Sequence, residues 1–190
     1  MAVKKEMAAA YELKITLLRV EPAVWRRVLV PRDIILDDLH LVIQRVMGWD
    51  NDHMHEFLIG RKRYGMMIPD DFGFSDSTVD ESIVRLNGVA KPKAKFQYLY
   101  DFGDNWAHEI VIEREIKSES NERLVSCTAG ENACPPEDCG GVYGYENMLK
   151  ILADDQDDEY SDIKEWLGDD FDPTQFDLKS ANQAVAEMRV

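Results

Sequence analysis

Histidines and carboxylates in the middle of the chain have the chemistry of metal ligands. His53 and His55 lie two positions apart in the segment HMHEF, and His108 follows the polar stretch DFGDN, which contains Asp101 and Asp104. Side chains two apart on a strand project to the same side, so this pair of histidines can chelate one ion. His53, His55, His108 and Asp104 are therefore the candidate ligands of a divalent metal, Zn²⁺, Mn²⁺ or Mg²⁺. The structural alternative places His108 in the core, bonded to a carbonyl, and pairs His53 with an acidic neighbour.

Carboxylates form a second candidate constellation. Asp101 and Asp104 belong to the stretch DFGDN, and Glu137 and Asp138 belong to the stretch CPPEDCGG. If the second stretch folds over the first, the four acids and His108 become candidate catalytic residues, with Mg²⁺ or Mn²⁺ as in phosphodiester-cleaving enzymes. The alternative is that these acids form turns and cap helices by accepting backbone N–H bonds.

Three cysteines, Cys127, Cys134 and Cys139, give a third candidate site, a thiolate site for a metal. Their spacing, C-x6-C-x4-C, differs from the two-residue knuckle of structural zinc sites, and a fourth ligand would have to be a distant histidine. The alternatives are buried thiols packed under two prolines, or a redox pair of Cys134 and Cys139. An odd number of cysteines argues against a disulfide framework and favours a reducing, cytoplasmic compartment.

Aromatic residues suggest a fourth role, which requires no catalysis. The segment GGVYGYE, with Trp49 and Tyr64, can form a surface for a protein or small-molecule partner, because exposed aromatics anchor interfaces. The alternative is burial of these rings in the core.

The charge of the chain bears on its partners. It has 37 acidic and 22 basic residues among 190, a formal net charge of −15. Such a surface repels the phosphate backbone, so direct nucleic-acid binding is disfavoured. No apolar run approaches the ~20 residues that span a bilayer, and the sequence predicts a cytoplasmic protein without a membrane segment.

The first half of the chain contains the elements that must position these residues. Residues 11–20 alternate apolar and polar side chains and predict a strand, and residues 24–30 predict a second strand that pairs with it as a hairpin. Apolar residues then recur every three or four positions between 35 and 46, which predicts a helix with Asp37 and Asp38 in its first turn, Asp33 as its cap and Gly48 at its end.

The central part reads as further strands. HMHEFLIG predicts a strand that carries His53, His55 and Phe57 on one face, with RKRYG as its partner, and residues 69–77 predict a surface loop. Residues 78–89 fit a short helix or a strand. Residues 96–112 predict a hairpin whose two aromatic faces meet in the core, followed by an exposed loop at SESNE.

The last third changes from loop to helix. The glycines and prolines of residues 127–145 predict a long ordered loop without regular structure, and three helical stripes follow, within residues 145–152, 160–167 and 178–188. The fold class is therefore α+β: an antiparallel sheet with one early helix packed on a face, then a C-terminal helical segment. We expect a flexible N-terminus over residues 1–10 and a single domain over residues 11–190.

Six motifs in order carry a resemblance to a known family. They are PAVWRRVLVP, VMGWD, HMHEF, YDFGDNWAHEI, CTAGENACPPEDCGGVYGYE and EWLGDDFDPTQFD. Together they closely resemble the plasmid pRiA4b ORF-3-like family, from residue 11 to about residue 184. Members often carry the pattern D-P-x-H-E-E, whereas residues 154–159 here read DDQDDE, so the histidine position is occupied by Asp157.

The resemblance implies little about chemistry. Some members are named as transposon resolvases or are joined to a repressor-type DNA-binding domain, which associates the family with mobile elements or regulation. This chain has no basic C-terminal DNA-binding region. The leading hypothesis is a non-catalytic binding or interaction module, and the alternative is a divalent-metal-dependent hydrolase of nucleotides or nucleic acids that uses His53, His55, His108 and Asp104. Whether DFGDN and CPPEDCGG meet in space tests both hypotheses.

Overall fold

A computed structural model describes residues 8–67, 78–118, 125–168, 171–186 and 188. The strands are β1 (Ala8–Leu17), β2 (Trp25–Pro31), β3 (His55–Ile59), β4 (Lys62–Gly65), β5 (Thr78–Asp80), β6 (Lys95–Tyr100), β7 (Trp106–Ser118) and β8 (Ser126–Glu131). The helices are α1 (Leu36–Met47), the 3₁₀ turn η2 (Glu81–Ile83), α2 (Leu86–Val89), α3 (Gly141–Leu152), α4 (Tyr160–Leu167) and α5 (Leu178–Val185). None of the helices described is long and apolar enough to cross a bilayer.

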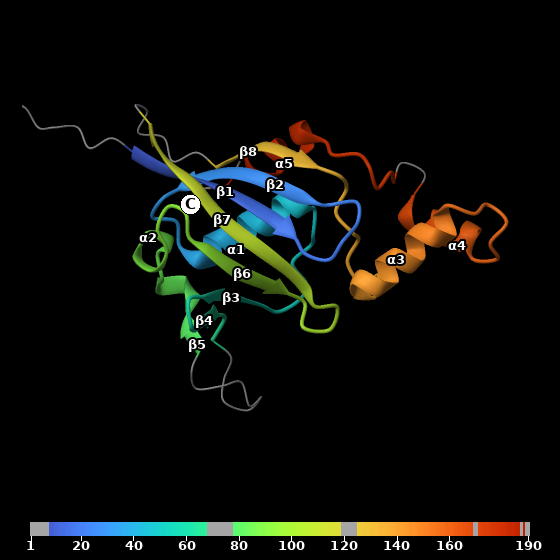
Figure 1. Cartoon of the computed structure of the whole chain (residues 1–190), viewed down its shortest axis with the longest axis horizontal. Helices are drawn as coiled ribbons and strands as arrows, with labels where there is room; N and C mark the ends of the chain where they lie inside the picture. The colour runs from blue at the N-terminus through green and yellow to red at the C-terminus, as the bar shows by residue number, and fades with distance from the viewer. Residues whose placement is uncertain (1–7, 68–77, 119–124, 169–170, 187, 189–190) are drawn as a thin grey trace, which may run out of the picture.

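The strands form one eight-stranded sheet in the order β5-β4-β3-β6-β7-β1-β2-β8 (Figure 1). Every pair is antiparallel except β4 with β5, which is parallel. Both predicted hairpins are present, β1 with β2 and β6 with β7. The predicted α+β class, with a mostly antiparallel sheet, is confirmed.

Helix α1 lies across one face of the sheet (Figure 1). Its buried stripe includes Leu39, Val42 and Ile43, and Gly48 ends the helix in the left-handed conformation at φ 89°, as the sequence predicts. The prediction that Asp33 caps the start is wrong. The N-cap position is Ile35, without a side-chain cap, and the Leu36 N–H instead donates to the Val84 carbonyl at 2.9 Å.

The two faces of the sheet differ in polarity. On the face under α1, the hairpin pairs Tyr100 with Trp106, Tyr98 with His108 and Phe96 with Ile110, all of them buried. This confirms the predicted meeting of the two aromatic faces in the core. The other face carries cross-strand ion pairs: Arg27 with Glu113 at 2.6 Å, Arg114 with Glu12 at 2.7 Å and Lys95 with Glu109 at 3.2 Å. One covered and one solvated face is the usual condition of an antiparallel sheet.

Residues 127–145 are more regular than the sequence predicts. Ser126–Glu131 forms β8 along β2, and α3 already begins at Gly141. Only residues 132–140 remain as an irregular connection, called the CPPEDCGG loop below. Residues 78–89 contain both a strand and short helices, β5, η2 and α2. The loop predicted at residues 69–77, and all of SESNE except Ser118, lie outside the described residues.

The C-terminal helix α5 covers the β8 edge of the sheet. The side-chain amide of Asn182 bonds both backbone groups of Cys127: its Oδ1 accepts from the N–H at 3.0 Å and its Nδ2 donates to the carbonyl at 2.6 Å. Beside it, the buried Arg26 donates to the carbonyls of Val46 and Glu131 at 3.0 and 2.9 Å, and its guanidinium lies 4.0 Å from the centre of the Phe176 ring. These contacts join α1, β2, β8 and the last segment into one body.

Helices α3 and α4 pack against each other and project from the end of that body (Figure 1). The predicted helical stripes therefore form three helices, and the last of them, α5, packs against strand β8.

Candidate functional site

The CPPEDCGG loop and the DFGDN turn do meet. The Gly140 N–H donates to the Asp104 carboxylate at 3.2 Å. Gly141 sits directly on the turn, where a Cβ atom would lie 2.5 Å from the Asp104 carbonyl oxygen, and its φ of +67° is itself unfavourable for other residues. Glycine at position 141 therefore permits the close approach of the loop to the turn.

Three further contacts hold the loop against the sheet. Trp49 donates its indole N–H to the Pro135 carbonyl at 2.9 Å. Glu137 accepts from the Asp50 N–H at 2.6 Å and from the Tyr100 hydroxyl. Burial, together with the Glu137 carboxylate, raises the pKa of Tyr100, so the phenol stays protonated and donates. Glu137, predicted as a candidate catalytic acid, is thus one of the residues that hold the loop against the sheet.

His53, Asp101 and Asp138 converge where the loop crosses the turn. The His53 Nε2 lies 3.1 Å from the Asp138 Oδ1, and its Nδ1 lies 3.8 Å from the Asp101 Oδ2. One ligand atom from each of the three residues falls within 4.8 Å of the others. Within the described part of the chain, no other three histidine, cysteine or acidic side chains meet this criterion.

Asp101 serves the turn and the cluster with different oxygens. Its Oδ1 accepts from the Gly103 N–H at 2.8 Å, and its backbone carbonyl accepts from the Asn105 N–H at 2.7 Å, which forms the turn. Its Oδ2 faces His53. The residue is left-handed at φ 55°, a conformation that aspartate tolerates better than most residues. Turn formation and ligand presentation, the two alternatives posed by the sequence, are therefore compatible at Asp101.

The other predicted metal ligands lie elsewhere. The His55 ring is buried and stacks on His40, with centroids 3.4 Å apart, and its Nε2 lies 2.9 Å from the buried Glu81 carboxylate. The two groups are close but are not aligned as a hydrogen bond, and neither nitrogen of the His55 ring has a hydrogen-bond partner. His53 does not share a strand face with His55, since it precedes β3 in a bend.

His108 lies in the core, as the alternative to a metal ligand predicted. It is fully buried, and its Nδ1 lies 3.0 Å from the Trp106 carbonyl. Burial lowers its pKa to about 4, so the ring is neutral at pH 7. Asp104 holds the loop through Gly140, as described above. The predicted set of His53, His55, His108 and Asp104 is therefore not brought together around one point.

A buried polar network near His55 was not predicted from the sequence. His40 on α1 contacts the Tyr98 hydroxyl through Nδ1 at 2.7 Å and the Asn51 side-chain oxygen through Nε2 at 2.6 Å, and Gln44 donates to the same hydroxyl at 2.9 Å. Asn51 can only accept at its oxygen, so His40 carries its proton on Nε2. Burial and His55 lower the pKa of His40 to about 3. The signal in the sequence was His40 and Gln44, four residues apart within the apolar stripe.

The cysteines do not form a cluster of three, and all three are free thiols. Burial raises the pKa of Cys127 and Cys134, and it raises that of Cys139 to about 12. Protonated thiols are poor nucleophiles and poor metal ligands.

The predicted aromatic surface is wrong for most of its members. Trp49, Tyr64 and Tyr145 are buried, and Trp49 stacks on Tyr100 with centroids 5.0 Å apart. Only Tyr143 of this set is strongly exposed, at 84%. Asp157 accepts from the Glu159 N–H at 2.9 Å before α4 and so forms a turn.

Comparison with known proteins identifies relatives over nearly the full chain. The family model for the plasmid pRiA4b ORF-3-like protein matches residues 9–180. Uncharacterized protein y4hQ of Sinorhizobium fredii is 40% identical over 185 residues, which cover 96% of this chain and 93% of that one. The crystal structure of a protein of unknown function, MM3350 of Methanosarcina mazei Go1, superimposes with a TM-score of 0.82 at 37% identity, covering 91% of this chain and 97% of that chain. The chain belongs to the plasmid pRiA4b ORF-3-like family.

Proposed function

We propose that the protein is a binding module that holds a divalent cation with His53, Asp101 and Asp138. The observation that carries this proposal is the convergence of one imidazole and two carboxylates from three separate segments. Two atoms that each bind one ion at ~2.1 Å in tetrahedral geometry lie about 3.4 Å apart. The 3.1 Å between His53 Nε2 and Asp138 Oδ1 is close to that separation. A mixed nitrogen and oxygen set suits Zn²⁺ or Mn²⁺ better than Mg²⁺.

The surroundings favour binding because two of the ligands are already fixed. The backbone N–H of His53 donates to the Tyr100 hydroxyl at 3.3 Å, and the turn that carries Asp101 is hydrogen-bonded internally. Because these two side chains are already ordered, binding an ion costs less conformational entropy. The Asp138 side chain is 74% exposed and therefore gives an ion access from solvent.

A metal-dependent hydrolase is the second candidate function. Three protein ligands leave coordination positions for water and substrate, which is the arrangement of catalytic rather than structural metal sites. The number of ligands is the observation that favours this candidate.

Metal titration tests the binding proposal. After chelator treatment, we expect the protein to bind one Mn²⁺ or Zn²⁺ per chain by isothermal titration calorimetry. His53→Ala and Asp101→Asn should each weaken this binding by about 100-fold, because each removes a ligand. Asp155→Asn is the matched control: it makes the same charge change at an exposed position outside the cluster, and it should bind like the wild type. Absence of stoichiometric binding, or wild-type affinity in both ligand variants, contradicts the proposal.

Turnover separates the two candidate functions. The metal-loaded protein is assayed with bis-p-nitrophenyl phosphate and with nucleoside triphosphates. Product formation that disappears in Asp101→Asn identifies a hydrolase, whereas one tightly bound ion without turnover identifies a non-catalytic module.

A further inference from the structure

An open groove of about 320 Å³ lies between α3 and α4. Such a volume is at the lower end of the range of small-molecule sites. The groove reaches the CPPEDCGG loop through Asp138. Both apolar and charged side chains line it.

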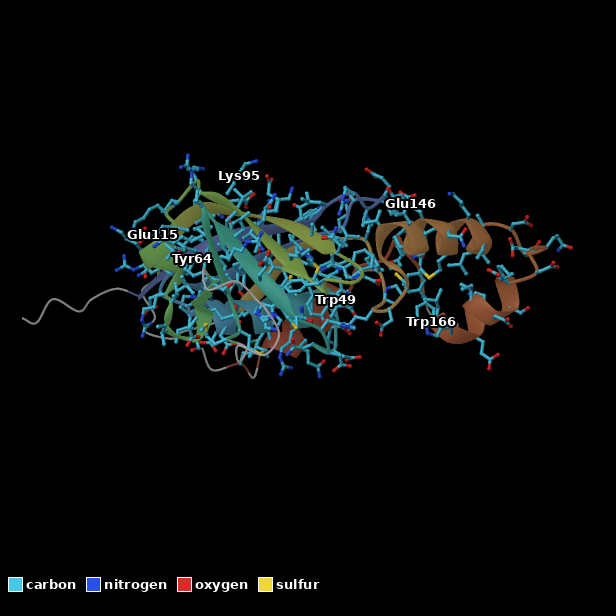
Figure 2. The ribbon with its side chains drawn as sticks, turned by 90° about the horizontal axis from the view of Figure 1, so that it is seen from below. Trp49, Tyr64, Lys95, Glu115, Glu146 and Trp166 are labelled. Atoms are coloured by element: carbon cyan, nitrogen blue, oxygen red, sulfur yellow. The ribbon has the colours of Figure 1, made fainter. Side chains whose placement is uncertain are left out.

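Four of the side chains that line the groove are apolar, and one of them is an aromatic ring. Met148 and Ile151 of α3 are buried, whereas Ile163 and Trp166 of α4 close the groove from the opposite helix. Trp166 is 51% exposed, and Figure 2 shows it on the side of α4 that faces the body of the protein. A large ring left half in water beside a groove is a ready contact surface for a ligand.

Two carboxylates also line the groove. Asp138 and Glu159 line it, and both are exposed. Residues 141–167, which include both helices, contain eight acidic residues and two lysines. The resulting field attracts cations and repels anions. Carboxylates beside a tryptophan face are also the combination that recognises organic ammonium groups, through ion pairing and cation–π attraction.

We propose that this groove binds a small organic cation with an apolar body, such as an arylalkylammonium. The ammonium group lies between the carboxylates of Asp138 and Glu159 and against Trp166, and the apolar body packs in the groove beside Ile163. The inference goes beyond the cation site proposed above and does not depend on it. The two sites share Asp138, so a divalent ion and the ammonium compete for its carboxylate.

Calorimetry of the metal-free full-length protein with three probes tests the proposal. Phenethylamine, protonated at pH 7, should bind at one site. Its neutral analogue 2-phenylethanol should bind at least about tenfold more weakly, and 3-phenylpropanoate should show no binding. Equal affinity for amine and alcohol overturns the proposal, because binding would then not depend on charge. Absence of amine binding overturns it too, including the case where light scattering shows that a second copy of the chain covers Trp166.

Variants assign the binding to the groove. Trp166→Leu keeps an apolar side chain but removes the ring, and Glu159→Gln removes one charge; each should weaken phenethylamine binding at least about fivefold. Tyr143→Leu is the control, an exposed aromatic outside the groove lining, and should bind like the wild type. Wild-type affinity in both Trp166→Leu and Glu159→Gln overturns the assignment. Asp101→Asn should lose binding of the divalent ion but still bind phenethylamine. Trp166→Leu should lose binding of phenethylamine but still bind the divalent ion. Either proposal can therefore fail while the other stands.

Discussion

His53 and His55 are separated by one residue, but their surroundings are opposite. The His55 side chain is 2% exposed, stacked on His40 and set against the buried Glu81. The His53 side chain is 27% exposed and lies between two carboxylates at the surface. The cause is local: β3 begins at His55, so the strand carries His55 inward while His53 remains in the preceding bend.

The contrast shows how the same residue type can be structural or available for a ligand. The polar groups around His55 come from α1, β6 and η2. His55 and its neighbours therefore connect helix α1 to the sheet. The groups around His53 come from two turns, and the Asp138 side chain is mostly exposed to solvent. Stability should therefore depend on His55, and ligand binding on His53.

The largest expected effect is on the buried side. His55→Ala removes a buried ring that stacks on His40 and leaves a cavity beside the buried Glu81, which should lower the free energy of unfolding by about 3–5 kcal/mol. His53→Ala, the matched control, should cost less than about 1 kcal/mol. Urea unfolding followed by tryptophan fluorescence measures both. Equal losses in the two variants would remove the distinction between the sites.

The second effect is on pH dependence. In the folded protein the pKa of His40 is about 3 and that of His108 about 4, against 6.5 in the unfolded chain. Below pH 6.5 the unfolded chain therefore binds protons that the folded protein excludes. Stability is complete above pH 6.5 and is lost as the pH falls toward 4, by about 2 kcal/mol for each histidine between pH 6.5 and 5.

Urea unfolding at pH 7 and pH 5 measures this loss. His40→Gln should remove about half of the pH dependence, because it deletes one of the two depressed groups. A wild type with the same free energy of unfolding at both values would show that these rings are not kept neutral by burial.

A third effect sharpens the role of the loop at the exposed site. In Gly141→Ala the new Cβ would lie 2.5 Å from the Asp104 carbonyl oxygen, so we expect a loss of about 2–4 kcal/mol and weaker Mn²⁺ binding. Gly60→Ala is the control, because φ is +64° there and nothing lies within 4 Å of the added Cβ. That variant should cost only about 1 kcal/mol and leave Mn²⁺ affinity unchanged. Equal losses of stability in Gly141→Ala and Gly60→Ala would mean that the loop moves away from the turn at no cost.

The smallest effect is expected at Asp101. Asp101→Asn keeps an oxygen that can accept from the Gly103 N–H, so the turn should persist and the metal-free protein should lose less than about 1 kcal/mol. Thermal unfolding in chelator measures this change. A loss as large as that of His55→Ala would show that Asp101 is mainly a structural residue.

The sheet and the helices were largely predictable because their patterns are local. Alternation at residues 11–20 and 96–112, and three- or four-residue spacing at 35–46, reflect which side of each element is buried. The start of α1 was not predictable, since its backbone is satisfied by Val84, far along the chain, and Asp33 is instead within 3.1 Å of Arg85. Strand β8 was missed because it lacks alternation and gains its order from β2 and α5.

The candidate site was predictable only in its parts. His53, Asp101 and Asp138 were each candidates, and the meeting of the turn with the loop was the expectation that joined them. Their grouping depends on where β3 begins and on the approach of Gly141 to Asp104, which no spacing in the sequence encodes. The His40 network needs the register of α1 over β6, a property of tertiary packing.

The amide of Asn182 has a consequence for self-association. An outermost strand presents unpaired N–H and C=O groups to which strands of other molecules can add. Asn182 occupies the donor and the acceptor of Cys127, the second residue of β8, as the backbone of a ninth strand would, and α5 lies over the same edge. Together with α5, this side chain covers part of the β8 edge, which leaves fewer backbone groups there for a strand of another molecule.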